Sequence, residues 1–249
     1  MRCAAISLAL CGVLWLSPQA AKAVECETLE HSGNSYAVCE VNPATEELRL
    51  FRADPTGIVY GHFSELETML GAFDKKLAFA MNAGMYHPDR APVGHYVEDG
   101  AEQMRVIPNA GPGNFGLLPN GIFCIRDRRA DVIETRDYLA SRPDCTHATQ
   151  SGPMLVIDGA LHPRFLPDST SRHIRNAVGT SIDGRRAVFA ISDNAVTFYE
   201  FAKFFRDVLK LPNALFLDGN VSRLFAPRLG RDDRGRQMGP IVAVVEPES

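Results

Sequence analysis

The stretch Ala214-Leu215-Phe216-Leu217-Asp218-Gly219 is an apolar run that ends in a carboxylate followed by a glycine. Such a run predicts a buried strand, and Asp-Gly at its end holds an acid at the rim of a sheet and turns the backbone sharply. Three further polar clusters also follow apolar runs: Asn82-Ala83-Gly84-Met85-Tyr86, Gln150-Ser151-Gly152-Pro153 and Arg172-His173-Ile174-Arg175-Asn176. We therefore expect polar side chains that are distant in the sequence to meet around Asp218.

Short apolar runs bounded by turn residues dominate the rest of the chain. They predict strands at residues 77–81, 154–157 and 241–245, and a hairpin formed by residues 36–41 and 47–51. Turn signals predict two more hairpins, 115–118 with 121–125 around Pro119-Asn120-Gly121, and 178–182 with 187–191 around Asp183-Gly184.

Two helices are predicted beside these strands. The first covers residues 64–73, with Ser64 as its N-cap. The second begins at Thr197-Phe198-Tyr199-Glu200, which has the spacing of a capping box, and ends before Pro212. Its apolar residues recur at helical spacing and predict core packing: Phe201, Phe204, Phe205, Val208 and Leu209. With no repeat or linker visible, we expect a single strand-rich α+β domain, with mostly antiparallel or mixed sheet and a few flanking helices.

The first 23 residues have the features of a cleaved secretory signal peptide. Arg2 precedes an apolar core at residues 4–16, and Ala21-Lys22-Ala23 is a small-x-small cleavage site. The mature domain would span residues 24–249 and be periplasmic or secreted. A lipid anchor at Cys11 is the weaker alternative, because Leu10 stands where a small residue is needed. No later segment approaches the length of an apolar membrane span.

Charge and cysteine content constrain the mature chain further. Removing Arg2 and Lys22 leaves 24 basic and 30 acidic residues, a formal net charge of −6, which disfavours nucleic acid as a partner. The basic stretches at 126–129 and 228–236 are interpreted as solvated loops. An exported chain with an even number of cysteines predicts two disulfides. Three pairings of Cys26, Cys39, Cys124 and Cys145 exist, and we favour Cys26–Cys39 with Cys124–Cys145 because each closes a modest loop.

The polar clusters supply the candidate catalytic residues Asp218, Arg175, Asn82 and His173. Arg175 offers a planar fork of donors that fits a phosphate, although a surface ion pair is the plain alternative. Asn82 can hydrogen-bond a sugar or phosphate oxygen or its own turn, and His173 can move a proton near neutral pH. The substrate-binding candidates are Tyr86, Asn114, Ser151, Asn176, Gly219 and Ser222.

No metal site or cofactor is predicted, although a structural calcium ion stays open. His87 and Asp89 could hold a metal, but a third ligand is not evident. Asn220-Val221-Ser222 is formally a glycosylation sequon, and a glycan there would block the predicted site.

The order of four motifs resembles the phosphodiester glycosidase domain family, in particular its bacterial exported branch. The motifs are Asn82-Ala83-Gly84-Met85-Tyr86, Ser151-Gly152-Pro153-Met154-Leu155, Arg175-Asn176-Ala177-Val178-Gly179 and Leu217-Asp218-Gly219, and the resemblance covers residues 77–245. Many members continue Asp-Gly with Gly-Gly-Ser-Ser, whereas this chain has Asn220-Val221-Ser222-Arg223.

The resemblance implies an enzyme that hydrolyses the bond between a sugar C1 and a phosphodiester oxygen. Asn82, Arg175 and Asp218 fall on positions of the family's polar cleft. We assign Arg175 to the phosphate with His173 as helper, Asp218 to the sugar centre as base or nucleophile, and Asn82 to orientation. Retention or inversion stays open.

Two other hypotheses remain beside this one. A serine or metal-assisted envelope hydrolase would use Ser151 with His173, or His87 with Asp89. A non-catalytic module would bind or assemble an envelope glycan. The predicted partner is accordingly a sugar phosphodiester or an envelope glycan.

Overall fold

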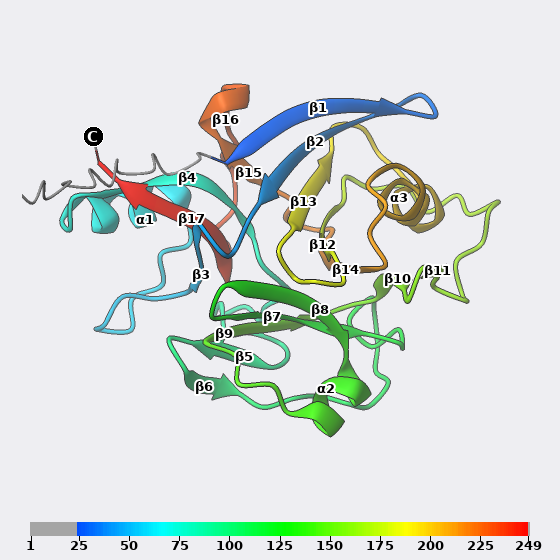
Figure 1. Cartoon of the computed structure of the whole chain (residues 1–249), viewed down its shortest axis with the longest axis horizontal. Helices are drawn as coiled ribbons and strands as arrows, with labels where there is room; N and C mark the ends of the chain where they lie inside the picture. Colours follow the sequence, from blue (N-terminus) through cyan, green and yellow to red (C-terminus); the bar gives the residue numbers. More distant parts are fainter. Residues whose placement is uncertain (1–23, 249) are drawn as a thin grey trace, which may run out of the picture.

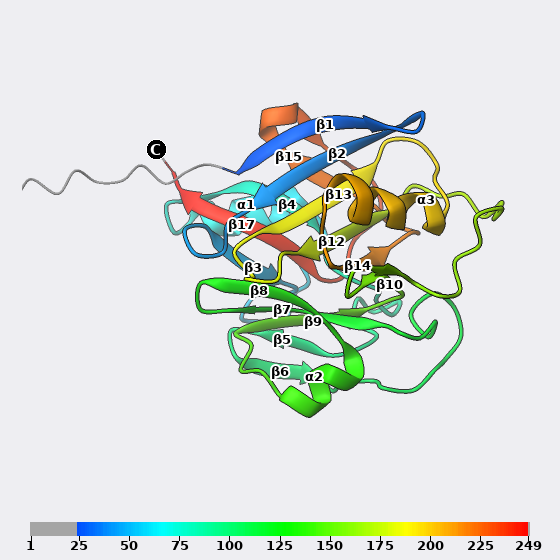
Figure 2. The same ribbon diagram turned by 45° about the vertical axis from the view of Figure 1, so that its right-hand side comes forward.

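The computed structural model describes residues 24–248, so the predicted signal peptide lies outside the described residues. Three antiparallel sheets and a few short helices make up this part of the chain, which confirms the strand-rich α+β class. One sheet forms the lower layer in Figures 1 and 2, and the other two lie above it. No helix within residues 24–248 is long and apolar enough to cross a membrane.

The sheets are named here by their central strands. The β12 sheet has the order β1 (Glu25–His31), β2 (Asn34–Val41), β13 (Ala187–Ser192), β12 (Asn176–Thr180), β14 (Asn213–Asp218), β10 (Met154–Ile157), β11 (Ala160–Leu161). The β4 sheet has the order β16 (Arg231–Asp232), β15 (Leu224–Ala226), β4 (Lys75–Asn82), β17 (Ile241–Pro247), β3 (Glu47–Phe51). The β9 sheet has the order β6 (Ala101–Met104), β5 (Tyr96–Glu98), β9 (His147–Ser151), β7 (Gly121–Arg126), β8 (Arg129–Glu134).

Successive strand residues alternate between a shared central core and three outer cores. In β14, Leu215 and Leu217 enter the central core, while Ala214 and Phe216 face the opposite side of the sheet. The strands β17 and β7 alternate in the same way. This two-residue period follows from the pleat of a strand, and it explains why these strands are apolar on both faces. The three sheets therefore enclose one core, and each has a second core on its outer face.

A helix covers part of each outer face. These helices are α1 (Phe63–Gly71), α2 (Thr135–Ser141) and α3 (Phe198–Lys203), the last continued by a π-helical turn, Phe204–Val208. The predicted capping box is confirmed, because Thr197 and Glu200 each bond the other's backbone N–H. Ser64 as N-cap is wrong: α1 begins one residue earlier, after His62. The aromatic stripe is core packing as predicted, with Phe201, Phe204 and Phe205 fully buried.

The hairpin predictions met different outcomes. The hairpin of β12 and β13 is confirmed. The predicted pairing of residues 36–41 with 47–51 is wrong, because β2 pairs with β1 and β13 while β3 pairs with β17 in another sheet. The residues at 115–118 form turns instead of a strand, so β7 pairs with β8 and β9. Both errors arose where partners were assigned by nearness in sequence.

Both predicted disulfides are present. Cys26–Cys39 joins directly opposed residues of β1 and β2, across a sequence separation of 13. Cys124–Cys145 spans a separation of 21 and ties β7 to the segment after α2, inside the outer core of the β9 sheet. The four-cysteine framework expected of an exported chain is thus confirmed in its pairing.

Removing the second disulfide is expected to destabilise the protein. For the double variant Cys124→Ser/Cys145→Ser we expect the free energy of unfolding to fall by about 3 kcal/mol, because a loop of this size is freed in the unfolded chain. Urea unfolding followed by far-ultraviolet circular dichroism measures this loss of stability. Adding a reductant should then shift the wild-type midpoint more than that of the variant. An unchanged midpoint in the double variant would contradict the expectation.

Candidate active site

Three strand ends converge at one rim of the fold. Because β12 and β14 are antiparallel neighbours, the first residue of β12 lies beside the last residue of β14, and Asn176 pairs with Asp218. Asn82, the last residue of β4, belongs to the other sheet. The Asn176 side-chain amide donates to Asn82 Oδ1 and thereby joins the two sheets. The Asp-Gly stretch and the Asn82 cluster are therefore close in space.

Backbone groups complete this junction. The Asn176 Oδ1 accepts from the Asp218 N–H at 3.0 Å, and Asn82 Oδ1 accepts from the Arg223 N–H at 2.9 Å. Asn82 and Asn176 are fully buried. Asn176 bonds through both groups of its amide, whereas Asn82 bonds through Oδ1 alone and its Nδ2 is buried without a partner. These bonds fix the backbone from which the Asp218 side chain projects.

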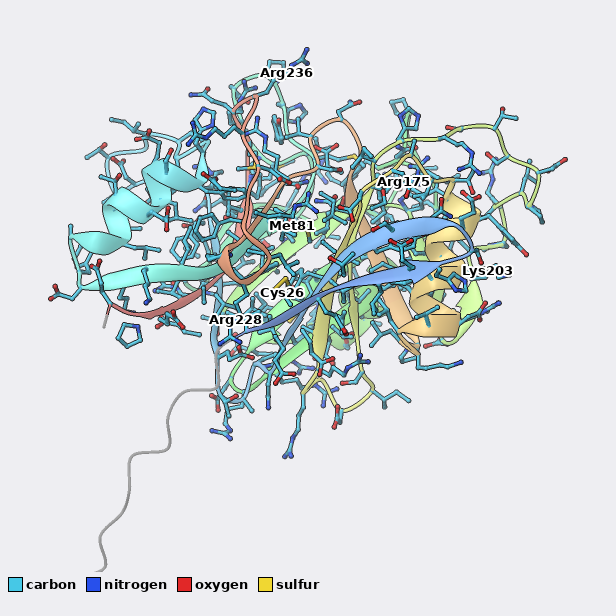
Figure 3. The ribbon with its side chains drawn as sticks, turned by 90° about the horizontal axis from the view of Figure 1, so that it is seen from above. Cys26, Met81, Arg175, Lys203, Arg228 and Arg236 are labelled. Carbon is cyan, nitrogen blue, oxygen red and sulfur yellow. A yellow bond between two sulfur atoms is a disulfide. The ribbon has the colours of Figure 1, made fainter. Side chains whose placement is uncertain are left out.

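A cavity of about 650 Å³ opens at this rim. Its lining includes the charged or titratable residues Arg90, His173, Arg175, Asp218 and Arg236. Figure 3 labels Arg175 and Arg236, which both lie in the upper half of that view. Three arginines against one carboxylate give the cavity a positive field, and such a field favours an anionic ligand.

The Asp218 carboxyl group is buried, with 6% of the residue exposed. Burial raises its pKa to about 6, although the backbone N–H groups of the following turn favour the ionised form. One of these, the Asn220 N–H, donates to Asp218 Oδ1 at 2.9 Å. The charge of Asp218 in turn adds to burial in raising the pKa of Tyr86, which lines the same cavity. A carboxyl group with this pKa can exchange protons near neutral pH.

Arg175 is more deeply buried than Asp218, with 1% exposed. Its Nε donates to Val196 O at 2.9 Å and its Nη2 to Ser171 O at 3.1 Å, while the guanidinium stacks 3.7 Å above the Phe198 ring. Its Nη1 is buried without a hydrogen-bond partner, and no ion pair of Arg175 occurs among the described residues. Burial lowers the pKa of Arg175 to about 10. The alternative of a surface ion pair is therefore wrong.

The other predicted site residues divide into two groups. Residues that line the cavity are His173, Tyr86, Asn114 and Gly219. Residues outside the lining are Asn82, Asn176, Ser151 and Ser222. The fully buried Ser151 donates its hydroxyl to Leu217 O at 2.7 Å, which is a link between β9 and β14.

Several lining residues escaped the sequence analysis. Arg236 and Gln237 stand in the segment that leads into β17, and Gln237 O accepts from the Tyr86 hydroxyl at 2.9 Å. They reach the cavity because Ile241 of β17 pairs with Asn82. No local sequence signal reveals this partner. Arg90 also lines the cavity, and its guanidinium lies 5.3 Å from the Tyr86 ring centre.

The alternative metal ligands do not gather with further donors. His87 and Asp89 are exposed, and within residues 24–248 no group of three or more His, Cys, Asp or Glu side chains is arranged to hold a metal ion. Asn220 of the sequon lines the cavity, next to Asp218 and Gly219.

Comparison with known structures places the fold beside two solved proteins. The catalytic domain of zebrafish N-acetylglucosamine-1-phosphodiester alpha-N-acetylglucosaminidase, auto-inhibited by its pro-peptide, superposes with a TM-score of 0.59 at 15% identity, covering 89% of this chain and 81% of that one. A putative exported protein from Burkholderia pseudomallei K96243 gives 0.55 at 12% identity, covering 85% and 74%. At these identities the likeness concerns the fold.

Sequence comparison carries the assignment further. An uncharacterized protein of Escherichia coli (strain K12), YigE, is 32% identical over 185 residues, which are 74% of this chain and 72% of that protein. The profile of the phosphodiester glycosidase family matches residues 75–244, which contain every strand end of the cavity rim. The chain therefore belongs to the phosphodiester glycosidase family.

Proposed function

We propose that this protein is an exported hydrolase that cleaves the bond between C1 of a sugar and an oxygen of a phosphodiester. Family membership supports a glycosidase-type activity, and the two disulfides fit an oxidising compartment. The observation that carries the proposal is that the unpaired guanidinium of Arg175 and the buried carboxyl group of Asp218 line one cavity.

The reaction divides between these two groups. The C1–O bond breaks with oxocarbenium character on the sugar, and the departing oxygen stays with the phosphate, which leaves as a monoester. The oxygen of a water molecule ends on C1. Asp218 either takes a proton from that water or first attacks C1 itself. Arg175 stabilises the negative charge that grows on the leaving phosphate.

A single carboxylate fits this leaving group. Asp218 is the one acidic residue among the described residues that line the cavity. An ordinary glycoside needs a second carboxyl group as general acid, because an alkoxide leaves poorly. A phosphate monoester is already a stable anion, so the arginine side of the cavity replaces that acid. His173 lines the same cavity, two residues before Arg175, and is assigned as a helper at the phosphate.

The apolar residues of the lining suit a sugar. Met85, Val93 and Phe115 line the cavity with apolar surface, on which the hydrophobic face of a pyranose can pack. Asn82 is assigned a positioning role, because its Oδ1 bonds Asn176 and the Arg223 backbone and the residue is not part of the cavity lining.

The test is an assay of purified protein against a panel of sugar-1-phosphodiesters that differ in the sugar. We expect release of the free sugar and a phosphate monoester in equal amounts from at least one compound. Substrates with an ordinary alkyl aglycone in place of the phosphate should react at least 100-fold more slowly, because Arg175 then has no anion to stabilise. Lack of release from the whole panel, together with labelling by a serine-directed fluorophosphonate or inactivation by a chelator, would support the rival hydrolase instead.

The pH dependence of kcat/KM gives a second expectation. The pKa of Asp218 is raised to about 6, and both roles assigned to it require the ionised form. Activity should therefore fall about tenfold per pH unit below pH 6 and level off above pH 7. Initial rates at low substrate concentration between pH 4.5 and 8 measure this profile. Activity that instead declines above pH 6 would mean that the protonated carboxyl group acts as an acid.

A further inference from the structure

A second buried arginine lies on the other side of the Asp218 turn. Arg223 is 5% exposed, and its Nη2 is buried without a hydrogen-bond partner. No ion pair of Arg223 occurs among residues 24–248. Burial lowers its pKa. A desolvated cation without a partner is unfavourable, and an anionic ligand would offset that cost.

The surroundings of Arg223 leave its guanidinium available. The nearby Asp233 is already engaged, since it accepts from Arg231 at 2.7 Å and from the Leu224 N–H at 2.9 Å. Gly235 packs against the guanidinium, and a Cβ at that position would lie 2.7 Å from Arg223 Nη2. Any other residue at 235 would press on the side chain. Gly235 also has a φ of +148°, which other residues rarely adopt, so the close approach of its backbone to the guanidinium depends on glycine.

This guanidinium lines a second cavity that adjoins the first. The second cavity has a volume of about 420 Å³ and contains three arginines, Arg223, Arg234 and Arg236. It shares Asn220, Val221 and Arg236 with the cavity of Asp218. Its one acid is the paired Asp233. This second cavity, which we call the groove, therefore adjoins the Asp218 cavity at Asn220, Val221 and Arg236, and basic residues outnumber acidic ones in its lining.

We propose that this second cavity is an anion subsite for the aglycone. The inference rests on the proposed function: if the first cavity holds the sugar and the scissile phosphate, the groove receives what lies beyond that phosphate. Arg223 and Arg234 would then bind a second phosphate group of the substrate. Two kinds of compound carry such a group, a glycan whose repeats are joined by phosphodiesters and a nucleoside diphosphate sugar.

The test compares three N-acetylglucosamine compounds. The first is the methyl 1-phosphodiester, which has one phosphate. The second has an aglycone of glycerol phosphate, so that its second phosphate is separated from the scissile one as in a polymer. The third is UDP-N-acetylglucosamine, in which the two phosphates are adjacent. We expect one of the two-phosphate compounds to have a kcat/KM at least tenfold higher than the methyl compound, mainly through KM. The compound that shows the gain identifies the kind of substrate, either a glycan joined by phosphodiesters or a nucleoside diphosphate sugar.

Variants connect this gain to the groove. Arg223→Gln should abolish the gain and leave the methyl compound within twofold of wild type, and Arg234→Ser should reduce the gain several-fold. Arg228→Ser removes the same charge from an exposed arginine that Figure 3 shows far from Arg236. This control should leave kcat/KM unchanged for the methyl compound and for the two-phosphate compounds. If Arg223→Gln does not fold, Arg234→Ser decides, because the Arg234 side chain is 91% exposed and its replacement leaves the core intact.

Equilibrium binding separates this inference from the proposed function. Calorimetry with the same compounds on the Asp218→Asn protein measures affinity without turnover. Tighter binding of a two-phosphate compound that Arg234→Ser weakens would support the subsite even if no compound is hydrolysed. Hydrolysis of the methyl compound without any gain from a second phosphate would overturn the subsite and leave the proposed function standing. A gain that survives both arginine variants would overturn it equally.

Discussion

Asp218→Asn is expected to lower kcat on a sugar-1-phosphodiester by about 10³-fold or more, while the protein folds normally. Asparagine has the same shape and keeps an oxygen that accepts from the Asn220 N–H, so the turn after β14 should persist. It cannot take a proton from water or attack C1. Steady-state kinetics with circular dichroism on the same sample measure both parts of this expectation.

Asp89→Asn is the matched control for this change. Asp89 is exposed, follows β4 on the same loop as Tyr86, and does not line the cavity. Its replacement removes one negative charge near the site without touching the reacting atoms, so kcat should stay within about threefold. Full turnover in Asp218→Asn would sink the assignment of Asp218 as base or nucleophile.

The Asp218→Asn variant should also be more stable than the wild type at alkaline pH. The folded-state pKa of Asp218, about 6, lies above its ordinary value of 3.8. Between these two values the folded protein binds more protons than the unfolded chain, so its stability decreases as the pH rises through this window. Ionisation of Asp218 then costs about 3 kcal/mol at pH 8, and asparagine avoids it. Urea unfolding should show this difference at pH 8 and its disappearance below pH 4.

The strands themselves could be predicted from the sequence, because their signal is local. In β14 the apolar run and the Asp-Gly turn mark both the strand and its end, and in α3 the Thr197–Glu200 pair marks the first turn. Which strands pair is a different question. The neighbours of β17 are β4 and β3, which both lie more than 150 residues earlier in the chain, and every apolar strand of similar length would fit the same pattern.

The candidate site could be predicted where its residues stand at strand ends, but not where their burial depends on strand pairing. Asp218 and Arg175 both stand at ends of predicted strands, and the structure brings them to one cavity. Arg234 and Arg236 belong to the stretch 228–236 that was interpreted as a solvated loop, and Arg223 precedes that stretch. Arg234 is indeed exposed. Whether an arginine in such a segment is solvated or buried depends on the pairing of β15 and β17 with β4. Burial and lack of an ion pair, the two properties that point to a ligand, are tertiary and have no local signature.

Arg175→Lys is expected to lower kcat/KM by about 10²-fold or more, although the positive charge is retained. The guanidinium donates to Val196 O and Ser171 O while Nη1 stays free, and one ammonium group cannot reproduce this fork. The loss should fall largely on kcat, since the charge on the phosphate grows as the bond breaks. Stability should fall by about 1–3 kcal/mol because buried carbonyls lose their donors, so rates are measured well below the unfolding temperature. Arg172→Lys, at an exposed arginine on the same segment that pairs with Glu200, should stay within twofold. If lysine supports full turnover at position 175, a diffuse positive field suffices, and the directed contact to the leaving phosphate is unnecessary.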